Sequence, residues 1–326
     1  MIDFYRRLVR KCQTVNQQNK VRIALENRMT PLELEIFRSE LQMVPGTYNV
    51  FLGMCVKQLR RKLPGAFKSW HMDFEVYLSA RNWVKMLDLA YLKSGKPYPE
   101  HFRRHKLRQQ LTLYKDGGDK HQKTLVICFS GNAQRMMMPM PVFLQHLDAK
   151  SMDVAFLKDP QRKGYQEGVD SIAPNLEQMF EELQTLLNIE EYRRVVAIGT
   201  SAGGLPAILA TLKLGLNAGL SVGGSDPEDP RWRMVDGIST EAMTPLDTKK
   251  PTVTPELFLA FGADRLNDRA KAEALAAVVP ARLLPISDPA EPVGHNALYS
   301  LVKQGKLSEF LHNTIDHSIS VVSYRY

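Results

Sequence analysis

The residues best suited to chemistry lie in segment 199–204, which reads GTSAGG. A serine nucleophile must project from a sharp turn with unfavourable backbone angles, so the positions two before and two after it cannot carry bulk. Gly199 and Gly203 occupy those positions around Ser201. The alternative is a Gly-rich turn that binds a phosphate at a helix N-terminus. Because the sequence lacks the dinucleotide-binding pattern G-x-G-x-x-G, we favour Ser201 as a nucleophile.

Short apolar runs alternate with amphipathic helical patterns around and beyond this segment. Strands buried on both faces read as continuous apolar runs, because crossover helices cover both sides of a parallel sheet. The pattern therefore predicts an α/β fold with a doubly wound, mostly parallel sheet. It also places Ser201 between a buried strand and a helix, as the G-x-S-x-G motif requires. The runs cover residues 124–130, 152–157, 194–199, 218–224, 256–262 and 281–286.

Two connections give further expectations. An Asp-Gly-Gly turn at 116–118 separates the apolar segments 109–115 and 123–130, which predicts an antiparallel hairpin. Residues 225–255 are long, polar and Pro-rich. We expect them to form a lid-like insertion between two strands.

From residue 124 to the end, the chain resembles the α/β-hydrolase superfamily. The matching parts are a strand followed by an oxyanion loop, the G-x-S-x-G elbow, an acid after a later strand, and then a histidine. The resemblance implies that the backbone N–H groups of Asn132 and Ala202 form the oxyanion hole. The loop reads Ser-Gly at 130–131, where the family often has His-Gly. An ordinary strand-ending glycine is the other interpretation of Gly131.

The same resemblance identifies the acid and the base. His295 follows the last expected strand and precedes a helix, so it takes the place of the base. Asp264 follows the strand at 256–262 and is our preferred acid, because a carboxylate on a loop can turn toward the histidine. Asp268, at the start of the next helix, is the alternative acid, although an Asp there can also serve as an N-cap. We expect neither a cofactor nor a metal site.

The first 108 residues differ in character from the rest. We expect a mainly helical, basic N-terminal region at 1–108 and an α/β-hydrolase catalytic domain at 109–326. A capping box at Thr30 and Glu33 opens one of the expected helices, and residues 49–63 continue the helical pattern. Residues 1–123 hold 24 Lys and Arg against 11 Asp and Glu, whereas the remainder hold 19 against 24. This surplus could bind an anionic partner, or it could be a solvated face. No nucleic-acid-binding signature accompanies it.

Two further segments each allow two interpretations. The methionines at 136–138 and 140 could line a flexible acyl pocket or pack in the core. Segment 158–162, KDPQR, follows an expected strand and could face the substrate or form a surface loop. Cys128 lies inside an expected strand, which predicts an inert buried thiol.

Composition and sequence patterns limit the cellular location and the functions that we expect. Three widely spaced cysteines form neither a disulfide framework nor a zinc pattern, and we see no signal peptide or membrane span, so we expect a cytoplasmic protein. The favoured hypothesis is a serine hydrolase that acts on a small-molecule or glycan acyl ester. The first alternative is an acyltransferase with the same triad that passes the acyl group to a sugar or other alcohol. The second is a non-catalytic binding protein that uses its basic N-terminal region.

Overall fold

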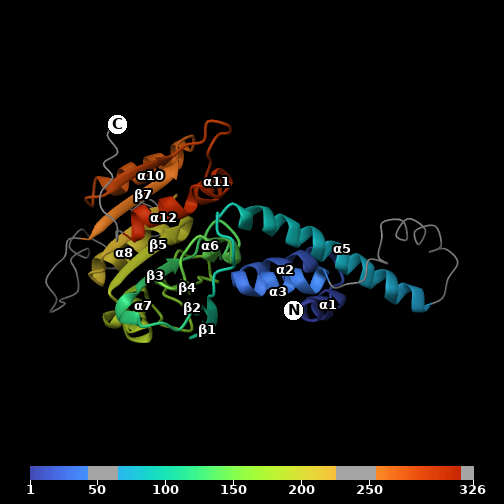
Figure 1. Ribbon diagram of the computed structural model, residues 1–326. Coiled ribbons are helices and arrows are strands. Elements are labelled where there is room, and N and C mark those ends of the chain that lie inside the picture. Colours follow the sequence, from blue (N-terminus) through green and yellow to red (C-terminus); the bar gives the residue numbers. More distant parts are fainter. Residues whose placement is uncertain (43–64, 225–254, 317–326) are drawn as a thin grey trace.

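The computed structural model describes residues 1–42, 65–224 and 255–316, and its architecture is shown in Figure 1. The residues expected to form the lid-like insertion at 225–255 lie outside these ranges, apart from Pro255, and so does the helical pattern at 49–63. None of the helices within the described ranges is both long and apolar enough to cross a membrane.

A single mixed sheet forms the centre of the molecule. Its eight described strands lie in the order β1-β2-β4-β3-β5-β6-β7-β8. The strands from β3 to β8 pair in parallel, whereas β1 and β2 pair antiparallel at one edge. The α/β fold with a mostly parallel sheet is therefore confirmed. The strand bounds are β1 Arg103–Lys106, β2 Leu111–Lys115, β3 Thr124–Phe129, β4 Met152–Leu157, β5 Arg194–Thr200, β6 Ala218–Val222, β7 Glu256–Gly262 and β8 Arg282–Ile286.

The hairpin expected between β2 and β3 does not form, and that prediction is wrong. β3 pairs in parallel with β4 on one side and β5 on the other, so neither of its edges is free for β2. Instead β2 pairs antiparallel with β4 and forms a hairpin with β1. The turn at 116–118 leads into a short 3-10 helix, η1 (Lys120–Gln122), and Lys123 then forms ion pairs with Asp116 and Asp153. These contacts hold the connection that carries the chain from the sheet edge to its centre.

Helices cover both faces of the sheet, as a doubly wound fold requires. One face packs against α7 (Leu176–Leu187), α8 (Gly204–Lys213) and α10 (Leu266–Ala276). The other packs against α6 (Met140–Gln145), α11 (Ala297–Gln304) and α12 (Leu307–Ile315). The buried residues of β3 alternate between the two cores, so this strand is covered on both sides.

The N-terminal helices extend to one side of the sheet (Figure 1). They are α1 (Ile2–Arg10), α2 (Val15–Glu26), α3 (Pro31–Gln42) and α5 (Gly65–Leu92). Tyr5, Phe37 and Trp83 pack together at their centre, with ring centroids 5.4–5.9 Å apart. The core around these rings continues through α6 to the sheet face, so the helices and the sheet share apolar packing.

The expected capping box of the N-terminal region forms, but the sheet begins earlier in the chain than we expected. The capping box is present: Thr30 N–H donates to the Glu33 carboxylate at 2.9 Å, and Glu33 N–H donates to Thr30 Oγ1 at 3.1 Å. Strand β1 lies before the boundary expected at residue 108, so the sheet begins within the segment that we expected to be mainly helical.

Candidate active site

Ser201 stands at a strained turn between β5 and α8. Its φ is +52°, in the left-handed region that residues other than glycine seldom occupy. Such a conformation costs on the order of 1–3 kcal/mol and persists only where the surroundings enforce it. The helical turn Ser201–Gly203 begins at this residue and runs directly into α8. This is the sharp strand-to-helix bend that the G-x-S-x-G motif predicts.

The glycines around Ser201 have no room for a side chain. A Cβ at Gly199 would overlap the Gly203 carbonyl, and a Cβ at Gly203 would overlap the Phe129 carbonyl at the end of β3. A Cβ at Gly204 would collide with the Ser221 hydroxyl. The turn is therefore packed tightly against β3 and β6. The prediction that bulk is excluded two residues before and after Ser201 is confirmed.

The loop after β3 lies directly against this turn. A Cβ at Gly131 would lie 2.9 Å from the Thr200 carbonyl oxygen and 3.1 Å from Ser201 Cβ. Gln134 N–H donates to the Gly131 carbonyl at 2.8 Å, closing a turn that leaves the exposed Asn132 within it. Ala202 lies in the first turn of a helix, where N–H groups have no partner inside the helix. Both predicted donors therefore lie in segments that adjoin Ser201.

Tyr165, which the sequence analysis missed, holds this loop from behind. Its buried hydroxyl lies 3.1 Å from the Ser130 carbonyl, 3.0 Å from the Leu157 carbonyl and 3.2 Å from the Ser130 hydroxyl. Burial raises the pKa of this phenol, so it stays protonated and can donate. Tyr165 itself has φ +64°, and Gly164 and Gly168 beside it are also left-handed. The sequence signal that could have identified Tyr165 is the pair of glycines near it, Gly164 and Gly168, in the connection that follows β4.

His295 contacts a buried carboxylate, and that carboxylate belongs to Asp268. The Nδ1 atom of His295 lies 2.6 Å from Asp268 Oδ2. The side chain of Asp268 is 5% exposed, whereas that of His295 is 41% exposed. The imidazole therefore has one ring nitrogen fixed by a carboxylate within the protein, and part of the ring remains open to solvent.

Our preference for Asp264 is corrected by this contact. Asp264 is exposed, and its carboxylate accepts the Val293 N–H at 2.8 Å, so it fastens the loop that leads to His295 and does not contact the ring. Asp268 is the third residue of α10, a helix whose N-cap is Arg265, so Asp268 is not the N-cap either. The first turn of α10 points its carboxylate inward. The loop can reach this place because Gly262 has no side chain: a Cβ there would overlap the Val293 and Gly294 carbonyls.

Ser201 and the His295–Asp268 pair adjoin the ends of two neighbouring strands, β5 and β6. Thr200 is the register partner of Val222 on β6, so Ser201 and Gly223 are the next residues of adjacent strands, which lie about 4.8 Å apart. A Cβ at Gly223 would lie 3.2 Å from both His295 Nδ1 and Asp268 Oδ2. Gly223 thus leaves the space beside the imidazole free, and its φ of +57° lies in the left-handed region that favours glycine.

The methionines and the cysteine that the sequence singled out lie in the hydrophobic core. Met136, Met138 and Met140 are fully buried in the core with α6, which agrees with core packing. Cys128 is buried within β3, and burial raises the pKa of its thiol, so it is an inert side chain as expected.

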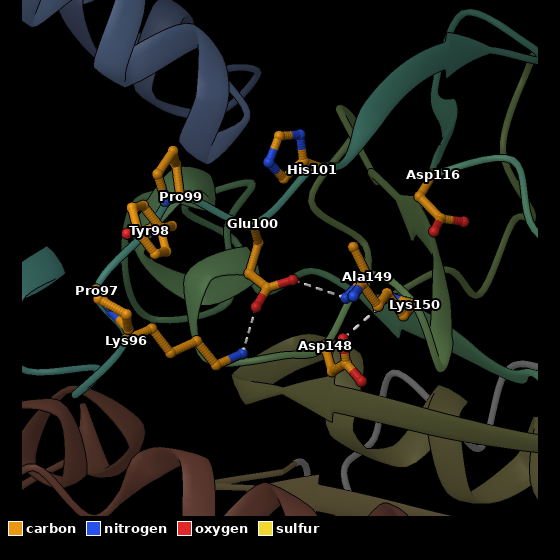
Figure 2. A pocket seen from close by; sticks show the side chains of 10 residues that line it. All are labelled: Lys96, Pro97, Tyr98, Pro99, Glu100, His101, Asp116, Asp148, Ala149 and Lys150. Atoms are coloured by element: carbon orange, nitrogen blue, oxygen red, sulfur yellow. Dashed lines mark hydrogen bonds and ion pairs between the residues drawn. The ribbon is translucent and has the colours of Figure 1, made fainter.

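A separate surface hollow of about 470 Å³ lies near the amino-terminal ends of the parallel strands, away from Ser201 (Figure 2). Asp148 and Ala149 in its lining precede β4, whereas Ser201 follows β5, and the two strands point the same way. The carboxylate of Glu100 accepts Lys96 Nζ at 2.7 Å and Ala149 N–H at 2.9 Å, as Figure 2 shows. These contacts fasten the segment between α5 and β1 to the sheet. The hollow is therefore remote from the serine turn.

Known proteins match this chain weakly in structure. No protein-family model matches the sequence, and no curated protein sequence matches it. Among solved structures, the chain is similar to dienelactone hydrolase from Anabaena variabilis (16% identity, TM-score 0.43, covering 66% of this chain and 100% of that one). It is also similar to esterase B from Lactobacillus rhamnosis (13%, 0.42, 72% and 95%) and to the enterobactin esterase from Shigella flexneri (16%, 0.40, 67% and 60%). This chain therefore spans 60% of the length of the last of these.

Proposed function

We propose that this protein is a serine hydrolase that cleaves an ester or related acyl bond through an acyl-Ser201 intermediate. The observation that carries the proposal is the contact between His295 Nδ1 and the buried Asp268 carboxylate, one strand away from a serine with φ +52°. A strained serine and a carboxylate-bound imidazole on adjacent turns are the parts that acyl transfer requires. A scaffold protein has no use for that combination.

The proposed reaction begins with removal of the Ser201 proton. The Asp268 carboxylate accepts a hydrogen bond from the Nδ1–H of His295, so Nε2 is the unprotonated nitrogen that takes the proton from Ser201 Oγ. The oxygen then attacks the acyl carbon. His295 returns the proton to the departing alcohol, and the acyl group remains on Ser201. A water molecule releases the acid by the same route, and Ser201 recovers its proton.

The charge that develops on the acyl oxygen needs donors beside Ser201. We assign the backbone N–H groups of Asn132 and Ala202 to this role, because their segments adjoin the serine. Asn132 lies in the turn closed by the Gln134–Gly131 hydrogen bond, and Ala202 lies in the helical turn that begins at Ser201. Removing one such donor typically costs about 3–4 kcal/mol of transition-state stabilisation. Tyr165 supports the Asn132 side by holding the Ser130 carbonyl.

Hydrolysis is favoured over transfer to an alcohol by the exposure of the base. The His295 side chain is 41% exposed, so water can reach the ring that must activate it. An acyltransferase with the same three residues must hold water away from the acyl-enzyme. Assays of acyl release with and without added sugars or simple alcohols separate the two: the proposal expects free acid as the main product in both.

Covalent labelling tests the nucleophile itself. A fluorophosphonate probe should label the folded protein once, and peptide mapping should place the label on Ser201. Ser201→Ala should abolish labelling, while Ser221→Ala, which changes a neighbouring hydroxyl on β6, should retain it. If folded protein resists the probe, or if Ser201→Ala is labelled as fast as the wild type, the serine-hydrolase proposal is wrong.

A further inference from the structure

Lys158 and Ser201 both lie beyond the carboxyl ends of parallel strands, β4 and β5. Lys158 is the first residue after β4, and its backbone N–H donates to the Gln110 carbonyl at 3.0 Å. Leu157 is the register partner of Phe129 on β3, and Phe129 is the partner of Gly199 on β5. Two strand spacings, or about 10 Å, therefore separate the ends of β4 and β5. The loop after β3 lies between them. In open α/β sheets, ligands bind along this edge, beyond the carboxyl ends of the strands.

The side chain of Lys158 is half-buried and has a neutral partner. Its ammonium lies 5.4 Å from the centre of the Phe156 ring and donates to the Asn27 carbonyl at 3.2 Å. Within the part of the chain that the structure describes, no carboxylate forms an ion pair with it. Its sequence position offered two interpretations, a surface loop or a residue facing the substrate. The contact with Asn27 places it where the turn after α2 meets the sheet.

Two further cations lie at the turn that Lys158 contacts: Arg28 is the residue after Asn27, and Arg104 donates to the Arg28 carbonyl. Burial, and then the positive charges of Arg28 and Arg104, lower the pKa of Lys158 to about 8. Arg104 lies 3.5 Å from the Arg28 carbonyl and forms an ion pair with Glu33 at 3.2 Å. Both arginines are exposed. We call Arg28, Arg104 and Lys158 the cation cluster.

Among the described residues, the cation cluster has one direct contact with a carboxylate. That carboxylate belongs to Glu33, and it also accepts the Thr30 N–H of the capping box. The C-terminus of α2 adds the equivalent of about half a negative charge. The carboxylates next to Lys158 and Asn27 in the chain have other partners: Asp159 accepts the Arg162 and Tyr165 N–H groups, and Glu26 accepts Trp83 Nε1. Capping of α2 accounts for the Lys158–Asn27 hydrogen bond, but the three cations share one direct contact with a carboxylate. A group with one or two negative charges would complete the site.

We propose that the cation cluster binds an anionic group of the substrate, a carboxylate or a phosphate, while the scissile bond lies at Ser201. This inference rests on the proposed function and names its substrate class: an acyl ester that carries an anionic group several bonds away from the reacting carbonyl. Such groups bind through charge-assisted hydrogen bonds from lysine and arginine. The partly desolvated ammonium of Lys158 gives up little further hydration when it binds.

Matched esters test this substrate class. One pair carries the charge on the acyl chain: mono-4-nitrophenyl glutarate against 4-nitrophenyl pentanoate. The other pair carries it on the alcohol: 4-acetoxybenzoate against phenyl acetate. We expect the anionic member of at least one pair to have a kcat/KM about tenfold or more above that of its neutral partner. Lys158→Met, which keeps the apolar stem, should remove that preference by raising KM.

Two control variants keep the test specific. Lys158→Arg should retain the preference, because it keeps the charge. Lys163→Met changes an exposed lysine in the same loop that pairs with Glu167, and it should leave both esters unaffected. If Lys158→Met slows anionic and neutral esters equally, the lysine only caps α2 and the proposal is overturned. A wild-type enzyme with no preference in either pair overturns it as well.

A binding measurement separates this proposal from the proposed function. Calorimetric titration of Ser201→Ala with glutarate and with inorganic phosphate needs no turnover and shows which anion is preferred. We expect saturable binding of one of them, weakened about tenfold or more by adding Lys158→Met. Saturable binding to Ser201→Ala, together with a wild-type protein that the fluorophosphonate probe does not label, would keep the anion site and refute the hydrolase. Absence of binding by both anions would refute the anion site alone.

Discussion

The substitution Asp268→Asn tests the assignment of the acid most directly. In the wild type, Asp268 Oδ2 lies 2.6 Å from His295 Nδ1, and the carboxylate is almost fully buried. Asparagine keeps the size of the side chain but removes its charge. The matched control is Asp264→Asn, because the amide oxygen of asparagine can still accept the Val293 N–H.

The expected loss follows from two effects. A hydrogen bond to a charged group contributes about 1.5–3 kcal/mol, so losing it from the imidazolium costs about 10- to 150-fold in rate. The asparagine amide can also donate to Nδ1, which moves the ring proton to Nε2 and blocks its role as a base; substitution of this kind can cost about 10⁴-fold. We therefore expect kcat/KM to fall between about 10² and 10⁴-fold in Asp268→Asn. Asp264→Asn should lose less than about fivefold.

Steady-state hydrolysis of a 4-nitrophenyl ester measures both variants, and the rate of fluorophosphonate labelling gives a second readout. Urea unfolding of each variant shows whether the protein remains folded. If Asp264→Asn is the more damaging change while both proteins are folded, Asp264 is the acid and the contact seen here is not the catalytic one. Equal and small losses in both variants would show that no carboxylate supports His295.

The other predictions concern the base, the oxyanion loop and a buried histidine. Ser201→Ala and His295→Ala should each lower turnover by about 10⁴-fold or more, and the double variant should lose little beyond either, because the residues act as a unit; additive losses in ester hydrolysis would contradict this. Tyr165→Phe should lower the free energy of unfolding by about 1–3 kcal/mol and lower kcat more than it raises KM, since it removes the single hydroxyl donor that the Ser130 and Leu157 carbonyls share. A stability loss with unchanged kcat would limit Tyr165 to packing. Burial and Lys96 lower the pKa of His146 from 6.5 to about 4. The unfolded chain therefore binds a proton near pH 6.5 that the folded protein binds only near pH 4, so the free energy of unfolding should fall by about 1.6 kcal/mol between pH 6.5 and 5. Urea unfolding of His146→Gln should show a smaller fall, while the exposed His121→Gln should match the wild type.

Prediction from sequence succeeded where the signal is local. The strand at 194–200 and the helix after it are continuous apolar segments, and Gly199 and Gly203 mark the bend between them. A backbone that must turn sharply needs glycine at fixed offsets, so residue type alone located Ser201. The position of His295 after the last strand also follows from the order of elements along the chain.

Prediction failed where the same local sequence is compatible with two different strand pairings. The segment 109–115 carries a strand pattern and is followed by a turn, but the pattern does not say which strand edge is free. The fold leaves β3 enclosed by parallel partners, and β2 therefore pairs with β4 at the sheet edge. Tyr165 was missed for a related reason, because its hydrogen bonds reach Ser130, 35 residues earlier in the chain.

The sequence by itself determined the layered architecture, the serine at its bend and the histidine that returns late in the chain. These depend on periodicity and on glycine, which act over a few residues. Only the tertiary structure decided which carboxylate meets the imidazole. Asp264 and Asp268 are four residues apart and carry the same side chain, but Asp264 lies on the loop before α10 and is exposed, whereas Asp268 lies in the first turn of α10 and is buried. Burial beside a distant loop is a property of the packed fold, and local sequence does not encode it.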